Sequence, residues 1–420
     1  MTTQNKATVA AMKRDLARQK QGYGLAGAFH TDAGHYALDL EHIFYQEWLF
    51  AGHTCQITKP GQWFTLQVGA QPIVVLRGED GSVRAFHNVC RHRGYRVCDA
   101  AKGQSARRLV CPYHQWAYEL NGDLARARDM QSDIDPKALG LKPVHACAVA
   151  GYIFICLAKQ PPDFAQFSRW LTDYTAPFDL EHAKVAFESR IVEKGNWKLV
   201  WENNRECYHC RGSHPELTRT FPETPSHSGA GDPAMKQQID DMIAKCEKLG
   251  MPGKFVIASD FQHRLMRLPL EGDARSMTMT GKPAVSKRLG ICPEDENIGD
   301  ILCYHYPTTW NHYTADHALS FRVLPISPTE TELVSRWLVR GDAVEGRDYD
   351  VTTLTEVWMA TNEQDTHLVE RTQAGVTSPA YEPGPFSALH EDGCIKFVDW
   401  YRHTMERRLA GGAAMMVAAE

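Results

Sequence analysis

Residues 90–116 read CRHRGYRVCDAAKGQSARRLVCPYHQW and contain two short groups of metal-binding side chains. The first is Cys90-Arg-His92, and the second, after 18 intervening residues, is Cys111-Pro-Tyr-His114. One thiolate from each group can hold one iron of a [2Fe–2S] cluster, while the two imidazoles hold the other iron. Zinc is the alternative, but zinc fingers usually keep the two cysteines together and the two histidines together. The alternating order therefore favours an iron–sulfur cluster.

The sequence around these groups has the pattern of a small all-β domain. Short runs such as FTLQV, PIVVLRG, VRAFHNV and GYIFICL are rich in β-branched and aromatic residues and are separated by Gly, Asp and Pro. We expect the domain to span residues 47–160, because a proline-containing stretch follows and the pattern becomes helical at 164–176. Cys98 lies between the two groups and is expected to be structural rather than a fifth ligand.

A helical segment is predicted before this domain. Residues 36–50 (YALDLEHIFYQEWLF) place apolar side chains close to helical spacing, which indicates an amphipathic helix that leads into the β domain. We expect residues 1–46 to be largely helical and to pack against the domain formed by residues 161–420.

Residues 161–420 are predicted to form an α+β domain. Residues 191–208 begin extended and become helical, and the helix should stop near His214-Pro215. Strand-like runs follow at 301–313, 317–326 and 330–340. A long helix is expected from about 350 to 374, with Gly375 as its C-terminal cap. This order predicts a sheet wrapped on the long helix.

Two histidines in this second domain are candidate metal ligands. His209 and His214 are five residues apart, so their rings converge only if the helix ends or loosens between them, which Gly212 and Pro215 permit. Cys207 and Cys210 lie one helical turn apart beside them, and a compact zinc site of these four Cys and His residues is an alternative.

The third ligand is predicted on the long helix. Asp365 shares a largely apolar face with its neighbours at i−7, i−4, i+3 and i+4, so its carboxylate should be buried and in need of a cation, a hydrogen-bond network or a metal. Glu363 is the competing carboxylate, but it points elsewhere on the helix. Two histidines and one carboxylate on one face of a metal are the ligands of non-haem Fe(II) oxygenases, which keep open positions for substrate and O₂.

Three segments together resemble the Rieske-type non-haem iron oxygenase alpha subunits. Residues 90–116 match the pattern C-x-H-R-G…C-P-Y-H-x-W, residues 196–217 resemble the family's iron-ligand region, and residues 362–373 resemble its carboxylate-ligand helix. The resemblance implies that a small all-β Rieske domain is inserted in a helix-grip catalytic domain. Cys90, His92, Cys111 and His114 would bind the cluster, and His209, His214 and Asp365 would bind mononuclear iron.

The resemblance also implies a ring of subunits, commonly a homotrimer, in which the cluster of one subunit supplies electrons to the iron of its neighbour. In such rings an acidic residue three positions before the first iron-ligating histidine bridges the two centres. The matching position is Glu206, where many ring-hydroxylating members carry Asp.

The bulk composition excludes several classes of protein. A net charge of -5 gives no electrostatic reason to expect nucleic acid or an anionic membrane as a partner. The longest apolar stretch, 147–158, is shorter than the roughly 20 residues that span a bilayer, and the N-terminus is too charged for a signal peptide. We therefore expect a cytoplasmic protein whose 12 cysteines are reduced thiols and metal ligands.

The two predicted metal centres define a reaction class. Monooxygenation with O₂ needs two electrons, and this sequence has neither a Gly-rich dinucleotide fingerprint nor a flavin motif. NADH should therefore act only through a separate reductase that contains flavin and an iron–sulfur centre. A Rieske electron carrier without oxygenase activity is the least favoured alternative, because a carrier would have no use for His209, His214 and Asp365.

The substrate is predicted from four further tracts. VWENNRECYHC, AVEGRDYDV, SPAYEPGPFS and FVDWY look like the family branch that demethylates betaines, namely proline betaine (stachydrine) and glycine betaine. The expected reaction is hydroxylation of an N-methyl group, followed by release of formaldehyde and the demethylated amine. A Rieske oxygenase that hydroxylates an aromatic or other small substrate is the alternative.

A quaternary ammonium favours aromatic faces, which attract a cation without a hydrogen bond. The run YHYPTTWNHY supplies four candidates in a strand-turn-strand setting: Tyr304, Tyr306, Trp310 and Tyr313. The alternative is that they are ordinary aromatic residues of the sheet. The group that receives the substrate carboxylate is not identified by the sequence.

Overall fold

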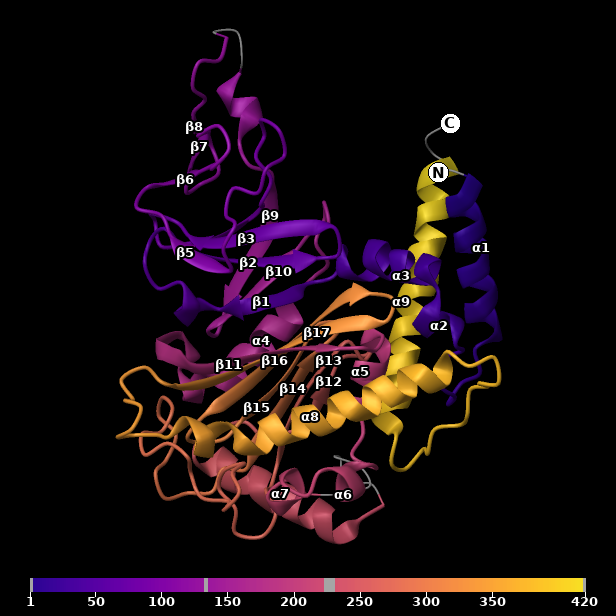
Figure 1. Ribbon diagram of the computed structural model, residues 1–420. Coiled ribbons are helices and arrows are strands. Elements are labelled where there is room, and N and C mark those ends of the chain that lie inside the picture. Colours follow the sequence, from indigo (N-terminus) through magenta and orange to yellow (C-terminus); the bar gives the residue numbers. More distant parts are fainter. Residues whose placement is uncertain (1–2, 132–134, 223–230, 418–420) are drawn as a thin grey trace.

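The computed structural model describes residues 3–131, 135–222 and 231–417. Two β-rich lobes are stacked, and helices from both ends of the chain, α1 (Thr3–Arg18) and α9 (Asp392–Val417), lie side by side next to them (Figure 1). In the described part of the chain, no helix is long and apolar enough to cross a membrane.

The first lobe is built from antiparallel strands. Its larger sheet contains, in spatial order, β1 (Leu49–His53), β10 (Tyr152–Cys156), β9 (Pro143–Val149), β4 (Val83–His87), β3 (Gln71–Arg77), β2 (Gln62–Val68) and β5 (Lys102–Gln104). A smaller sheet contains β6 (Arg108–Val110), β7 (Ala117–Glu119) and β8 (Leu124–Arg126). The two predicted ligand groups lie in loops, the first after β4 and the second between β6 and β7. Loops held by a rigid sheet are the usual carriers of function.

The second lobe contains one antiparallel sheet. Its spatial order is β11 (Ala183–Glu193), β17 (Glu330–Arg340), β16 (Ala318–Ser327), β15 (Thr309–Tyr313), β14 (Asp300–His305), β13 (His263–Leu268) and β12 (Val256–Ile257). Helix α8 (Val351–Val376) crosses the front of this sheet (Figure 1). The Asp350 carboxylate caps α8 by accepting the Thr353 N–H at 3.0 Å. The predicted cap at Gly375 is wrong: the helix continues to Val376, and Thr377 follows with a right-handed φ of -76°.

The other helices connect and flank the sheets. They are α2 (Ala28–Thr31), α3 (Ala33–Asp39), α4 (Ala165–Thr175), α5 (Trp197–Asn204), α6 (Cys210–Ser213) and α7 (Pro233–Lys248). A π-helical turn spans Leu40–Phe44, and 3₁₀ turns span Thr54–Gln56, Pro136–Leu139, Ala176–Phe178, Leu180–His182 and Leu217–Arg219. The helix predicted over 36–50 ends earlier than expected, because Leu49 and Phe50 pair with β10 as part of β1.

The N-terminal segment is anchored to the second lobe by Asp39. This carboxylate is fully buried and accepts hydrogen bonds from Trp197 Nε1 at 3.0 Å and from Tyr401 Oη at 2.7 Å. The Lys198 ammonium, also fully buried, pairs with the same carboxylate. Because these partners lie on α5 and α9, we propose that residues 1–46 belong with the domain formed by residues 161–420, and that residues 47–160 form the other domain.

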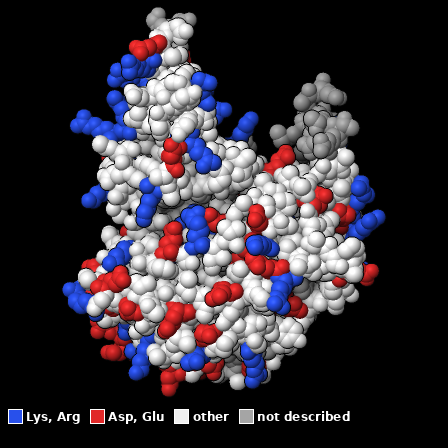
Figure 2. All heavy atoms as spheres, in the orientation of Figure 1, with Lys and Arg blue, Asp and Glu red and all other residues white. Residues whose placement is uncertain are grey.

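The rear face of the second sheet packs against the first lobe. Tyr152 Oη and Tyr313 Oη are 2.5 Å apart across this interface, and Thr308 Oγ1 accepts the Phe50 N–H at 2.8 Å. The front face is therefore the one left to α8 and the segment around α6. On the side of the molecule shown in Figure 2, basic side chains gather on the first lobe, whereas the second lobe mixes both signs.

Candidate metal centres and substrate cavity

The two ligand groups of the first lobe lie in similar turns. The Cys90 N–H donates to Tyr95 O and the Cys111 N–H to Trp116 O, both at 2.8 Å, so each turn closes five residues after its cysteine. Both cysteines are buried, and the rings of His92 and His114 have centroids 4.6 Å apart. Trp116 stacks on His92 at 4.9 Å.

These four side chains fit a cluster with two cysteine and two histidine ligands. His92 Nδ1 is buried and has no hydrogen-bond partner in the described part of the chain, which is costly for an imidazole nitrogen unless it binds a metal. Cys98 differs, because its backbone is tied to Asn88 by hydrogen bonds of 2.9 and 2.7 Å and burial raises the pKa of its thiol to about 12. The hydrogen bonds to Asn88 agree with a structural role for Cys98.

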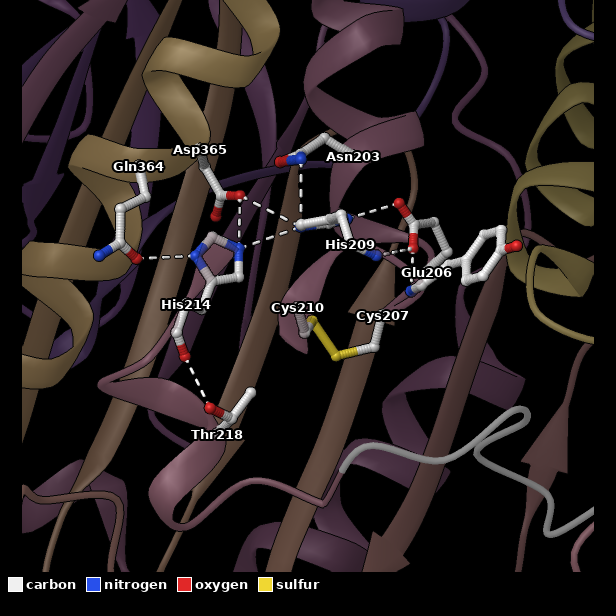
Figure 3. Close-up of a disulfide and its surroundings, with 10 residues drawn as sticks. Asn203, Glu206, Cys207, His209, Cys210, His214, Thr218, Gln364 and Asp365 are labelled. Carbon is white, nitrogen blue, oxygen red and sulfur yellow. Dashed lines mark hydrogen bonds and ion pairs between the residues drawn. A yellow bond between two sulfur atoms is a disulfide. The ribbon is translucent and has the colours of Figure 1, made fainter. Parts of the chain in front are cut away.

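The second candidate centre joins three side chains from two segments that are far apart in sequence, around residues 209–214 and at residue 365 (Figure 3). His209 Nε2 lies 3.0 Å from His214 Nε2, and Asp365 Oδ1 lies 3.5 and 3.1 Å from these two atoms. Only the four-residue helix α6 separates the histidines. Because the helix ends at Ser213, directly before His214, the two imidazole rings can converge. Ligand atoms held at right angles by metal bonds of about 2.1 Å are about 3 Å apart, so the three atoms fit one metal ion.

The orientation of both imidazoles is fixed by hydrogen bonds at Nδ1, the ring nitrogen that faces away from the candidate metal site. Glu206 Oε1 accepts from His209 Nδ1 at 2.5 Å, and Gln364 Oε1 accepts from His214 Nδ1 at 2.8 Å. The Gln364 amide is itself oriented, because its Nε2 donates to Glu216 at 2.7 Å. With both protons on Nδ1, the two Nε2 lone pairs and a carboxylate oxygen point at one place, which calls for a cation there.

The electrostatics of this centre favour positive charge. Burial favours the neutral imidazole, but hydrogen bonds to Asp365 and Glu206 outweigh it and raise the pKa of His209 to about 9. Likewise, burial opposes the charged form of Asp365, yet the two histidines hold the pKa of its carboxyl below the usual value. Glu363 is exposed, so Asp365 is the carboxylate that faces the histidines.

The cysteines beside this centre are bonded to each other. Cys210 Sγ lies within 4.8 Å of the His209 and His214 nitrogens, but Cys207 and Cys210 form a disulfide (Figure 3). Neither sulfur is then a thiolate, so the compact zinc site considered above has lost two of its four ligands. The expectation that all cysteines are reduced or metal-bound is also wrong at this pair, because their Cα atoms, 4.9 Å apart, are close enough for a disulfide.

A cavity of about 590 Å³, including its mouth, opens beside His209, His214 and Asp365. Of the four predicted aromatic residues, Tyr304 and Trp310 line it. Tyr306 does not, because it is fully buried behind Tyr304, whose ring stacks on it at 4.6 Å. Tyr313 does not either, because it lies on the opposite face of β15 and bonds to Tyr152 of the first lobe.

Other residues that line the cavity were not predicted as substrate contacts. Trp358 and Thr361 stand seven and four positions before Asp365 on α8, so their helical spacing was a usable signal. Arg205 and Arg264 also line it. Arg205 directly follows α5, and Arg264 comes from β13, where no local motif marks it.

The fold and the two centres define a Rieske oxygenase alpha subunit. The chain belongs to the family described as ring hydroxylating alpha subunit (catalytic domain), whose model matches residues 168–407, and the Rieske [2Fe-2S] domain model matches residues 47–145. The predicted α+β fold, with an all-β Rieske domain and a helix-grip catalytic domain, is confirmed. Its cofactors are a [2Fe–2S] cluster and mononuclear iron, and its class is non-haem iron monooxygenase.

Two curated relatives cover nearly the whole chain. The glycine betaine monooxygenase oxygenase subunit of Chromohalobacter salexigens is 46% identical over 401 residues, which are 94% of this chain and 89% of that protein. The protein of the same name from Pseudomonas aeruginosa UCBPP-PA14 is 45% identical over 405 residues, which are 95% of this chain and 93% of that protein.

Solved structures agree on the fold and differ in ligand. A quaternary ammonium Rieske monooxygenase in complex with L-carnitine has a TM-score of 0.70 at 20% identity and covers 93% of this chain and 97% of that chain. Naphthalene 1,2-dioxygenase from Rhodococcus sp. bound to indole has a TM-score of 0.67 at 17% identity, and the match covers 96% of this chain and 98% of that chain. The fold is thus common to proteins that bind unrelated small molecules.

Proposed function

We propose that this chain is the oxygenase component that removes one N-methyl group from glycine betaine. The observation that carries the proposal is the likeness to two glycine betaine monooxygenase oxygenase subunits along nearly the whole chain. Proline betaine, the other predicted substrate, has the same chemical class, a quaternary ammonium with a nearby carboxylate.

Each metal centre is assigned to named residues in this proposal. Cys90, His92, Cys111 and His114 would hold the [2Fe–2S] cluster, and His209, His214 and Asp365 would hold the mononuclear iron. When bound, the cluster supplies single electrons and the iron activates O₂ for insertion into a C–H bond of the N-methyl group. Two electrons and two protons reduce the second oxygen atom to water, and the N-hydroxymethyl product breaks its C–N bond to give dimethylglycine, formaldehyde and a proton.

The protein's contribution is orientation and exclusion of water. Glu206 and Gln364 keep both Nδ1 protons away from the metal, so that the Nε2 atoms remain free to bind it. The indoles of Trp310 and Trp358, at 7% and 6% exposed, give the cavity an apolar, π-rich wall suited to a trimethylammonium group. An N-methyl group on this wall would lie in the same cavity as His209, His214 and Asp365.

Electron supply requires other chains. As an oxygenase subunit the protein needs a reductase, and we propose one that contains flavin and an iron–sulfur centre and takes electrons from NADH. We also propose a homotrimer in the cytoplasm, with Glu206 between the cluster of one subunit and the iron of the next. Within the chain, Glu206 already accepts from His209, which is half of such a bridge.

The proposal is tested by turnover of a substrate panel. The iron-loaded protein, a compatible reductase, NADH and O₂ are mixed with glycine betaine, proline betaine, choline, benzoate or naphthalene, and formaldehyde and hydroxylated products are measured. We expect formaldehyde from glycine betaine at the highest kcat/KM. Hydroxylation of benzoate or naphthalene while both betaines stay inert would overturn the proposal in favour of an aromatic substrate.

A further inference from the structure

Two arginines in the cavity wall have no anionic partner among the residues that the structure describes. Arg205 and Arg264 are each only 7% exposed, and both line the cavity beside the candidate iron site. The Nε atom of each is buried without a hydrogen-bond acceptor. Within the described residues, no carboxylate lies within 4 Å of either guanidinium, and the one side-chain bond is a long contact of 3.5 Å from Arg205 to Asn204 Oδ1.

Other buried arginines, on the sheet of the second lobe, do have hydrogen-bond acceptors. Arg322 donates to Glu332 at 3.0 Å, and Arg336 donates to Glu188 at 2.6 Å. Arg267 donates to the carbonyl oxygens of Ile298 and Pro252 at 2.6 and 3.0 Å. A buried cation normally needs such partners, because removing it from water is costly. Arg264, on β13 of this sheet, and Arg205, at the end of α5, lack such partners, and both line the cavity.

The ring of Tyr304 compensates only in part for the missing anionic partners of Arg205 and Arg264. The guanidinium carbons of Arg205 and Arg264 lie 4.1 and 5.0 Å from its centroid, within the range of cation–π attraction. Such contacts are worth less than the loss of hydration of a guanidinium. Tyr304 also stacks on Tyr306. Because the ring of Tyr304 already contacts two guanidinium cations, it is a poor binding site for the substrate ammonium.

The register of the sheet places Arg264 and Trp310 on opposite sides of Tyr304. Arg264 on β13 pairs with Tyr304 on β14, and Tyr304 pairs with Trp310 on β15. Neighbouring strands are about 4.8 Å apart, so Arg264 and Trp310 stand roughly 10 Å apart along one row. A short zwitterion fits this row with its anionic end at the arginines and its cationic end at Trp310, toward the metal ligands.

We propose that Arg205 and Arg264 bind the carboxylate of the substrate and thereby select betaines over quaternary ammonium compounds without an anionic group. This inference rests on the proposed function and adds the specificity-determining residues to it. Two charge-assisted donors would fix the carboxylate and leave one N-methyl group at the iron site. Choline, which carries a hydroxyl group instead, would leave both guanidinium groups without an anion.

The test combines binding and thermal unfolding of the iron-loaded protein without reductase, so that no turnover occurs. Arg264→Met and Arg205→Met keep much of the side-chain length and remove the charge. We expect glycine betaine to bind each variant roughly 10- to 100-fold more weakly by calorimetry, as expected for loss of charge-assisted hydrogen bonds, and choline to bind with an affinity close to that of the wild type. Arg347→Met, which removes an exposed charge far from the cavity, controls for net charge.

Thermal unfolding separates this role from a structural one. Because an unpaired buried charge destabilises the ligand-free protein, Arg264→Met should raise its Tm. Arg322→Met, which removes one of the two arginines that pair with Glu332, should lower the Tm. Glycine betaine should raise the Tm of the wild type and not that of Arg264→Met. If Arg264→Met does not fold, Arg264→Gln, which keeps hydrogen-bond donors without the charge, is used for the binding comparison.

Two negative results have different meanings. If the wild type binds glycine betaine and the arginine variants bind it equally well, the carboxylate assignment is overturned while the proposed function stands. If no betaine binds to the wild type or is turned over by it, the proposed function itself fails.

Discussion

Glu206→Gln should slow electron transfer far more than it disturbs either metal centre. In the structure Glu206 Oε1 accepts from His209 Nδ1 at 2.5 Å, and Oε2 accepts the His209 N–H at 3.3 Å. Glutamine keeps the size but offers only one acceptor oxygen, so one of these N–H groups must face an amide N–H. Loss of such a contact behind a metal ligand typically weakens metal binding about 10- to 100-fold, which excess iron can overcome.

Glu206 is proposed to have a second role that excess iron cannot restore. If it bridges to the cluster of the neighbouring subunit, the variant should reduce its cluster normally but oxidise it slowly in a single turnover, with little formaldehyde formed. Stopped-flow absorbance of the cluster and a formaldehyde assay measure both rates. Gln364→Met is the matched control, because Gln364 holds His214 in the same way, at 2.8 Å, without lying at the bridging position. The reasoning is refuted if both variants, saturated with iron, oxidise their clusters at the wild-type rate.

Three further predictions concern the iron, the core and the cavity. Asp365→Ala should lose the mononuclear iron and all turnover while the visible spectrum of the cluster persists, and activity near that of the wild type would mean that another carboxylate is the ligand. Asp39→Ala leaves the Lys198 ammonium buried without a partner and should cost about 3–5 kcal/mol in urea unfolding, and an unchanged midpoint would contradict this. Trp310→Ala should raise the Kd for glycine betaine about 10-fold, as a loss of 1–2 kcal/mol implies, and an unchanged Kd in calorimetry would remove Trp310 from the ammonium site.

The convergence of the proposed metal ligands could be predicted mainly from local signals. The two Cys/His groups lie in turns only a few residues long, and the spacing within each turn already brings thiolate and imidazole together. Asp365 was identified from the apolar face of its helix, and the structure turns that face toward the cavity. The break in the helix between His209 and His214 likewise followed from the position of Gly212 and Pro215.

The cavity wall could be predicted only in part. Trp310 and Tyr313 are three residues apart on one strand, and alternation along a strand places them on opposite faces, so the exclusion of Tyr313 was readable from spacing. The exclusion of Tyr306 was not, because Trp400 of α9, distant in sequence, covers it at 4.8 Å. Arg264 reaches the cavity through the register of β13 on β14, a long-range pairing that no local pattern reveals.

Two of the predicted element ends were wrong, for different reasons. Gly375 was expected to end the long helix, but its φ is not positive. The helix continues to Val376, and the backbone of Thr377 is still in the right-handed helical region. Leu49 was expected to be helical but joins a strand, because pairing with Ile155 outweighs the helical spacing of its neighbours. At Leu49, strand pairing with a distant segment therefore outweighed a weak local preference.

The central claim is tested most directly by supplying glycine betaine labelled with ¹³C in its methyl groups to the iron-loaded protein, with reductase, NADH and O₂. We expect labelled formaldehyde and dimethylglycine in equal amounts, with one formaldehyde for each NADH consumed in product formation. NADH consumption without labelled formaldehyde, at substrate concentrations that saturate binding, would contradict the assignment of this chain as a betaine demethylase.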